Sequence, residues 1–272
     1  MRPWLRLVHN AVATAMRDDL LDWAATLSFY FLFALFPTVL LVASLLSVFH
    51  LEALTANLVA TLTRNLPGDA ARLVAAQLRQ LLSQPVPGLI SLDLLLVFYS
   101  SSQAFSGLMA ALNAAYELPE TRSYFRRLAL ALLLTFSAGI LIALALATLL
   151  LGQHLLDLVA GPLPAASALL RFWPLLRWGL TLAFMMLALL LLYRFAPSAP
   201  PARAGRLAGV AVALGLWVLA SALLAAYVNH FAAYSALYGS LGAVIALMLW
   251  FYCFALAILL GAEFHHAWLR QR

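Results

Sequence analysis

The sequence predicts an all-α fold, a polytopic membrane helix bundle with six transmembrane helices. Two features of the composition point to it, since apolar residues make up 65% of the 272 positions and charged residues only 10%. A soluble domain carries charge at about a quarter of its positions, so this chain has too few charges to cover a surface that faces water. A third feature is that long uncharged stretches recur along the chain, as in proteins whose surface faces hydrocarbon.

Six apolar runs are long enough to cross a hydrocarbon core of ~30 Å, which takes about 20 helical residues. Lipid offers the backbone no hydrogen bonds, so each run is predicted to be a helix that satisfies its own N–H and C=O groups. The chain is predicted to form a single membrane domain, 1–272, because no separate soluble segment interrupts the runs. The predicted spans are 24–49, 90–116, 128–152, 174–195, 207–228 and 239–262.

The connection between the first two spans, residues 51–87, is predicted to be an amphipathic helical hairpin. A Pro-Gly-Asp turn divides it into two short helices, and Val74, Leu78 and Leu81 fall on one face of the second. Two interpretations stay open. The hairpin either lies passively on the outer membrane–water boundary or covers a central cavity as a lid.

The arginines predict the orientation of the chain in the membrane. All sixteen basic residues are arginines, and the formal net charge is +6. Eleven of them lie in the N-terminal segment, the second and fourth connections and the C-terminal tail, whereas five lie in the other connections. The positive-inside rule therefore places both termini in the cytoplasm. Arg122, Arg126 and Arg127 are candidate contacts for lipid headgroups, and membrane lipids are the predicted partners.

The second span carries a polar face. Tyr99, Ser102, Ser106, Asn113 and Glu117 share one side of a helical wheel, because offsets of three, four and seven residues stack along a helix. Polar groups are costly at membrane depth, so this face must meet another helix or a wet cavity. Interhelical hydrogen bonding and the lining of a substrate pathway are both compatible with this pattern.

The last span carries a stripe of small residues that includes Gly239, Gly242 and Ala246. Small side chains let helix backbones approach closely, which is a common packing device in membranes. The stripe therefore predicts a helix-packing seam.

No catalytic or metal-binding pattern is visible in the sequence. The single cysteine excludes a disulfide framework within the chain, and the six histidines are scattered. Motifs such as HExxH, GxSxG and the phosphate-binding glycine loop do not occur. We therefore expect no enzymatic activity, no cofactor and no nucleic-acid partner.

Three sequence blocks carry a family resemblance: WAATLSFYFLFALFP, YSSSQAFSGLMAALNAAYELPETRSYFRRL and YSALYGSLGAVIALMLWFYCFALAILLGAEFHHAW. In this order they resemble the YihY/BrkB family of bacterial inner-membrane proteins. The resemblance implies location in the inner membrane. The family was once labelled ribonuclease BN, a label generally regarded as a misassignment. One branch is associated with serum resistance and virulence, and another with export of lipid A precursors.

Three hypotheses about function follow. The first is a carrier or flippase-like protein that moves or handles a lipid or another amphipathic envelope component. The second is an accessory or structural membrane protein that maintains the envelope without transport. The third, a ribonuclease, is disfavoured because the short cytoplasmic segments lack a carboxylate cluster for metal ions. A homo-oligomer or an envelope-protein partner remains open.

Overall fold

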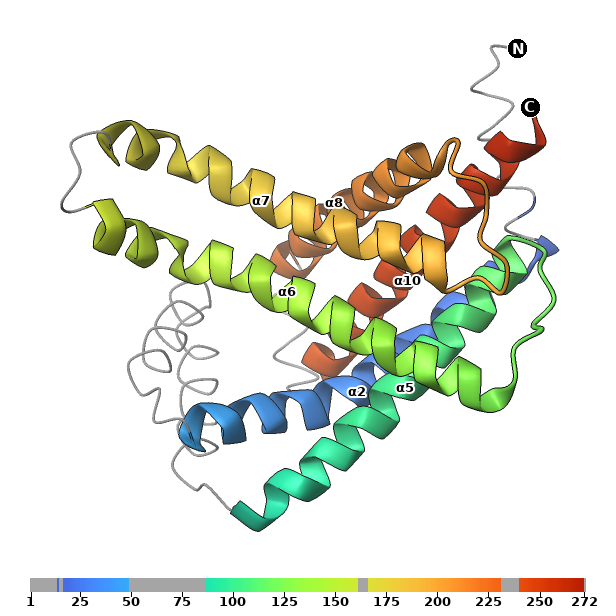
Figure 1. Ribbon diagram of the computed structural model, residues 1–272, viewed down its shortest axis with the longest axis horizontal. Coiled ribbons are helices and arrows are strands. Elements are labelled where there is room, and N and C mark those ends of the chain that lie inside the picture. The colour runs from blue at the N-terminus through green and yellow to red at the C-terminus, as the bar shows by residue number, and fades with distance from the viewer. Residues whose placement is uncertain (1–13, 15–16, 49–86, 161–165, 231–239, 272) are drawn as a thin grey trace. The chain divides into compact units, whose positions relative to one another are not determined.

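The computed structural model describes residue 14 and residues 17–48, 87–160, 166–230 and 240–271. Within these ranges long helices account for most residues and no strand occurs, which confirms the all-α fold (Figure 1). Residues 51–86 of the predicted hairpin lie outside the described part of the chain. The helices are α2 (Leu20–Val48), α5 (Pro87–Ala115), α6 (Tyr124–Ala160), α7 (Ala166–Phe195), α8 (Arg206–His230) and α10 (Ser240–Arg270).

Four helices in the described ranges are long and apolar enough to cross a membrane, and they overlap the last four predicted spans. The first two predicted runs overlap α2 and α5, which have 29 residues each, and both runs extend one residue past the end of the helix. The structure thus supports four of the six predicted spans, and the full count of six stays a prediction. The four segments are Tyr124–Ala145, Leu175–Phe195, Arg206–Tyr227 and Val244–Arg270.

Large apolar side chains are exposed along the membrane-length helices. On α6 the exposed residues Leu133, Phe136, Ile140 and Leu144 follow one another at intervals of three or four, so they form one face of the helix. Contiguous apolar surface of this kind is rare on soluble monomers. Hydrocarbon is the environment that such a face suits, which agrees with the prediction of a membrane protein.

The chain divides into two units, and most of the described contacts lie in the first. Its core includes Leu27 of α2, Leu112 of α5 and Leu259 of α10, all of which are fully buried. A second layer of this core is aromatic, because Phe31 of α2 lies with its ring centroid 5.8 Å from that of Phe254 in α10. Unit 1 comprises residues 1–32, 101–145 and 182–272, and unit 2 comprises residues 33–100 and 146–181.

Helices α8 and α10 lie side by side, and glycine allows the close approach (Figure 1). A Cβ atom added at Gly261 would stand 2.6 Å from the Gly209 carbonyl oxygen, 2.6 Å from Ala213 Cβ and 2.5 Å from the Tyr193 hydroxyl. No real side chain fits at these distances, so backbone meets backbone at this crossing. This is the packing that small residues permit between membrane helices.

In unit 2, two threonine hydroxyls bond within their own helices. Thr38 Oγ1 donates to the Ala34 carbonyl at 2.7 Å, and Thr181 Oγ1 donates to the Arg177 carbonyl at 2.8 Å. A hydroxyl that bonds four residues back is satisfied without a partner helix, which suits an apolar environment. Phe172 and Leu175 are exposed, so this unit also presents apolar surface.

Candidate functional site at the polar end of unit 1

The candidate site lies where two connections of unit 1 meet α10. The α5–α6 connection spans residues 116–123, the α7–α8 connection spans residues 196–205, and both contact His265 near the end of α10. We call this region the polar end. Most of the hydrogen bonds and ion pairs that the structure describes for charged side chains of unit 1 lie in this region.

Helix α5 ends at the polar end in a left-handed turn at Glu117, whose φ is +51°. The Leu118 amide donates to the Asn113 carbonyl at 2.8 Å, and the Glu117 amide donates to the Ala114 carbonyl at 2.9 Å. This pair of bonds is the Schellman motif, which usually has glycine at the left-handed position. Glutamate occupies it here, and its carboxylate joins two other segments.

The Glu117 carboxylate links the start of the chain's described part to its end. Arg17 Nη2 lies 2.7 Å from Glu117 Oε1, and Arg270 on α10 donates to Glu117 Oε2. All three side chains are partly exposed, so solvent screens both ion pairs and they add little to stability. The structure therefore differs from the predicted wheel, because Glu117 lies beyond the end of α5 and is not part of its face.

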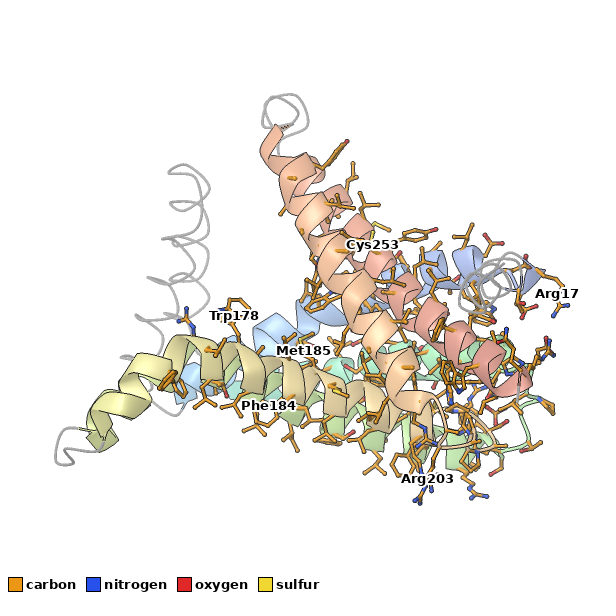
Figure 2. All side chains as sticks on the ribbon, turned by 90° about the horizontal axis from the view of Figure 1, so that it is seen from above. Arg17, Trp178, Phe184, Met185, Arg203 and Cys253 are labelled. Carbon is orange, nitrogen blue, oxygen red and sulfur yellow. The ribbon has the colours of Figure 1, made fainter. Side chains whose placement is uncertain are left out.

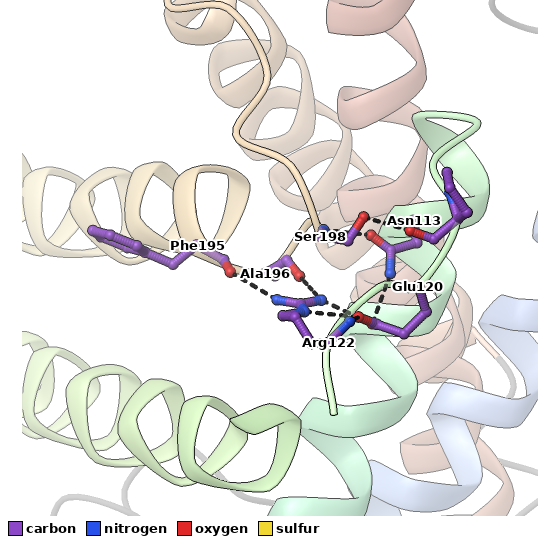
Figure 3. Close-up of polar contacts among 7 residues, drawn as sticks. Asn113, Glu120, Arg122, Phe195, Ala196 and Ser198 are labelled. Atoms are coloured by element: carbon purple, nitrogen blue, oxygen red, sulfur yellow. Dashed lines mark hydrogen bonds and ion pairs between the residues drawn. The ribbon is translucent and has the colours of Figure 1, made fainter. Parts of the chain in front are cut away.

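A second set of contacts, which we call the polar clasp, joins the two connections (Figure 3). The Arg122 guanidinium binds both carboxylate oxygens of Glu120, at 2.8 and 2.9 Å. The same guanidinium donates to the carbonyls of Ala196 at 2.8 Å and Phe195 at 3.4 Å. Those carbonyls stand at the end of α7, where the last turn of a helix has no intrahelical donors. Arg122 therefore caps α7 with its charge as well as with its hydrogen bonds.

Asn113 completes the polar clasp from α5. Its Nδ2 donates to Glu120 Oε2 at 2.9 Å, and its Oδ1 accepts a bond from the Ser198 amide at 2.7 Å. The Ser198 hydroxyl in turn donates to the Pro119 carbonyl at 2.7 Å. The buried amide thus holds the two connections in register, and both of its polar groups are engaged inside the protein.

The Arg122 guanidinium sets the acidity of its carboxylate partner. Hydrogen bonds and charge from Arg122 lower the pKa of Glu120 to about 2, and partial burial opposes them. The clasp therefore holds its ion pair at every pH well above that value. Among the charged residues of this connection, Arg122 is the one whose side chain is nearly buried, at 7% exposure.

A buried tyrosine–histidine pair anchors α10 to both connections. Tyr116 Oη lies 3.0 Å from His265 Nδ1, and His265 Nε2 lies 3.0 Å from the Ala204 carbonyl oxygen. A carbonyl only accepts, so we assign the imidazole proton to Nε2, and Nδ1 then accepts the hydroxyl proton of Tyr116. Gly205, with φ +77°, follows Ala204 and presses against the Trp268 ring, where no Cβ would fit.

The predicted headgroup contacts divide into two kinds. Arg122 is held inside the polar clasp and is not available to lipid. Arg126 is exposed and Arg127 is half-buried on the first turn of α6. Beside them Tyr124 and Phe125 are exposed, the latter at 81%, with their rings in an edge contact at 5.7 Å. Headgroup contact therefore stays a prediction for Arg126 and Arg127.

The predicted polar face of α5 is distributed over different surroundings. Ser102 is buried and Ser106 half-buried in unit 1, whereas Tyr99 is 62% exposed in unit 2. The adjacent Ser100 donates to the Leu96 carbonyl of its own helix at 2.6 Å. Asn113 belongs to the polar clasp, so it serves to hold the fold together. A pathway along this face stays a prediction.

The structure describes only part of the predicted helix-packing seam on the last span. Gly239 lies outside the described residues, Gly242 lies in the first turn of α10, and Ala246 is half-buried. The close backbone contact that the structure does show lies at the other end of α10, at Gly261. Sequence reasoning did not single out that crossing, although Gly209 and Gly261 are glycines inside apolar helices, which is a signal for close packing.

Several residues of the polar end were not predicted from the sequence as part of a site. Glu120, Ser198 and His265 form the contacts described above, and each lies in a connection or past an apolar run. The proline and charged residues of the second connection were the available signal, because an ordered loop must satisfy its own polar groups.

Comparisons with known proteins give the chain a family. The family model described as "Virulence factor BrkB" matches residues 11–272. The chain belongs to the BrkB family. Together with the apolar helices, this makes it a membrane protein. The resemblance stated from the three sequence blocks is confirmed.

Individual relatives agree with the family. The chain is 30% identical over 240 residues to the "Putative ribonuclease-like protein YfkH" of Bacillus subtilis, covering 88% of this chain and 86% of that one. A "UPF0761 membrane protein" of Aeromonas salmonicida is 35% identical over 36% of this chain and 34% of its own length. Another of the same description, from Tolumonas auensis, is 37% identical over 28% of this chain and 25% of its own. No solved structure gives a significant match.

Proposed function

We propose that this BrkB-family protein handles an anionic lipid or another amphipathic envelope component at the bacterial inner membrane, and moves it between leaflets. In this proposal both termini face the cytoplasm, as the arginine distribution predicts. The observation that carries the proposal is the exposed edge at the start of α6, where Tyr124, Phe125 and Arg126 stand together at the end of a membrane-length helix.

Each part of this edge suits the headgroup layer of a membrane. Aromatic side chains collect at membrane–water interfaces because one end of the ring is apolar and the other tolerates water. An arginine near an anionic surface contributes ~1 kcal/mol of attraction. Arg122, four residues before Arg126, is engaged in the polar clasp, so the edge does not depend on it. The edge is thus a place where an anionic headgroup can bind beside hydrocarbon.

Leaflet exchange of a labelled lipid tests this proposal. Purified protein is reconstituted into vesicles of phosphatidylcholine with labelled phosphatidylglycerol, and the label reaching the opposite leaflet is followed by chemical quenching. We expect exchange above protein-free vesicles, and a several-fold slower rate when Arg126 and Arg127 are both replaced by Gln. The control is Arg270→Gln, which removes one arginine charge from an ion pair at the polar end and should keep the rate.

The results separate transport from an accessory role. If the wild-type protein moves neither phosphatidylglycerol nor a lipid A precursor, transport is excluded and a non-transporting accessory protein becomes the better description. If exchange occurs but is equal in the Arg126→Gln/Arg127→Gln protein, the edge at α6 is not the headgroup site.

We do not carry the ribonuclease-like name of the Bacillus relative to this chain. In the described residues no three His, Cys, Asp or Glu side chains come together in a way that could hold a metal ion. Metal-dependent RNA cleavage would need such a group. Cleavage by purified protein that is abolished by replacing one acidic residue would overturn this view.

A further inference from the structure

Arg206 at the start of α8 is a buried arginine with an incomplete set of partners. The residue is 8% exposed, and its Nη2 donates to the Pro201 carbonyl at 2.6 Å. This bond turns the guanidinium back over the connection that leads into α8. Its Nε is buried and has no hydrogen-bond partner among the residues that the structure describes. A buried charged donor without an acceptor is costly, so the position calls for another group.

The charges around Arg206 are of its own sign. Arg194 at the end of α7 and Arg203 in the α7–α8 connection are the charged side chains that act on it, together with the Tyr116 hydroxyl. Arg203, labelled in Figure 2, is exposed. No carboxylate of the described residues is among these neighbours. The charged groups that the structure describes around Arg206 therefore produce a positive potential that an anion would neutralise.

Two of these arginines lie at a helix N-terminus, since Arg206 is the first residue of α8 and its amide bonds the Arg203 carbonyl. Helix α8 has 25 residues and begins at Arg206, so its first N–H groups and the positive end of its dipole face the α7–α8 connection. Helix N-termini bind phosphate and sulfate groups for this reason. Arg206 is an independent reason to expect an anion here, because its buried Nε is a hydrogen-bond donor without a described acceptor.

The connection around this helix end is held firmly in place. His265 binds the Ala204 carbonyl, Gly205 packs on the Trp268 ring, and Arg122 binds the Ala196 carbonyl. The Arg206 amide itself bonds the Arg203 carbonyl at 3.4 Å. A site whose frame is already ordered loses little conformational entropy when a ligand binds.

We propose that Arg194, Arg203 and Arg206, with the N-terminus of α8, form a binding site for a phosphate group. The class of ligand follows from the chemistry, since guanidinium groups match phosphate oxygens in geometry and the helix end favours a compact anion. This site would add a binding residue set to the proposed function. The expectation that the phosphate belongs to a lipid headgroup rests on that proposed function. A free phosphate has the same chemistry and is the other source to be tested.

Binding by the full-length protein in neutral detergent tests this site. Inorganic phosphate and pyrophosphate are titrated in one arm, and nanodiscs of phosphatidylcholine with phosphatidic acid serve in the other. Binding is followed by calorimetry and by thermal unfolding. We expect saturable binding of phosphatidic acid that Arg206→Gln weakens at least tenfold and Arg203→Gln weakens less, because Arg203 is exposed. Arg17→Gln is the matched control, since it removes an exposed arginine outside the cluster and should bind as the wild type does.

Each outcome decides one question. Binding of phosphatidic acid without binding of free phosphate identifies a lipid headgroup, whereas binding of both identifies a general phosphate site. Equal binding by wild-type protein and folded Arg206→Gln, or no binding in either arm, overturns the proposal. If Arg206→Gln does not fold, Arg203→Gln decides, and wild-type affinity in that variant overturns the site.

The two proposals fail in different ways. Phosphate binding that persists while leaflet exchange is absent supports this site and removes transport. In the opposite case, the wild-type protein exchanges lipid, and Arg203→Gln and Arg206→Gln bind phosphate as well as the wild type does. That result excludes this site and leaves the transport proposal standing.

Discussion

Arg122 and Arg126 lie four residues apart and have opposite surroundings. Arg122 is enclosed in the polar clasp, where it binds Glu120 and caps the end of α7. Arg126 stands exposed on the first turn of α6 beside Phe125. The same residue type, in one short segment, holds the fold together at one position and is exposed at the other. What differs is the supply of acceptors, since only Arg122 meets the carbonyls that a helix end leaves unsatisfied.

The largest expected effect comes from removing the buried member of this pair. Arg122→Gln leaves Glu120 and the Ala196 carbonyl without their charged donor, and we expect a loss of about 3 kcal/mol of stability. Thermal unfolding of purified protein in detergent, followed by tryptophan fluorescence, measures it. Arg126→Gln is the matched control and should change stability by less than ~0.5 kcal/mol. Equal unfolding temperatures for the two variants would contradict the distinction between the clasp and the exposed edge.

A smaller loss is expected at the α8–α10 crossing, which is as enclosed as the clasp but has no charges. Gly261→Ala places a methyl group 2.5 Å from the Tyr193 hydroxyl, and we expect it to cost about 2 kcal/mol through overpacking. Gly139→Ala is the control, because a Cβ there meets nothing within 4 Å. That change should leave the unfolding temperature unchanged or raise it, since alanine favours helix by about 1 kcal/mol over glycine. Similar destabilisation by both would show that the crossing is not tightly packed.

The smallest effect concerns acid. Because the pKa of Glu120 in the folded protein is about 2, below its ordinary value of 4.5, its contribution to stability is complete above 4.5 and is lost as pH falls toward 2. The carboxylate is partly open to solvent, so we expect a loss of about 1 kcal/mol. Unfolding temperatures at about pH 6 and about pH 3 should differ less in Glu120→Gln than in the wild type.

Glu117→Gln is the control for the acid experiment, because it removes a carboxylate at the polar end that lies outside the clasp. It should keep the acid-dependent loss that Glu120→Gln reduces. If Glu120→Gln and the wild type lose the same stability on acidification, the clasp does not hold its carboxylate ionised in the way we infer.

The membrane fold was readable from the sequence because its cause is local. A run such as 128–152 is apolar along its length, and lipid requires any such run to be helical whatever its neighbours. The run falls within α6, and the runs at 174–195, 207–228 and 239–262 fall at α7, α8 and α10. The family resemblance was equally readable, since three ordered sequence blocks carried it and the family model confirms it.

The candidate site was only partly readable. Asn113 and Arg122 were singled out as pathway and headgroup residues, and tertiary contacts place both in the polar clasp. Their partners Ser198 and Ala196 are about eighty residues away in sequence, so no local pattern could pair them. Glu117 shared the polar face of the second span on a helical wheel. In the structure α5 ends two residues before it, at Ala115, and Glu117 itself takes the left-handed conformation.

The sequence by itself determined that this protein is helical and suited to a membrane, because composition and run length act through solvation of each segment separately. Only the tertiary structure decided which arginines are engaged, which glycines touch and which carboxylate holds the end of α5 to α10. These outcomes depend on unpaired carbonyls and backbone surfaces that exist only after the helices have packed. Arg206 shows this most clearly, since neither its burial nor the lack of a described partner for its Nε is visible in the sequence.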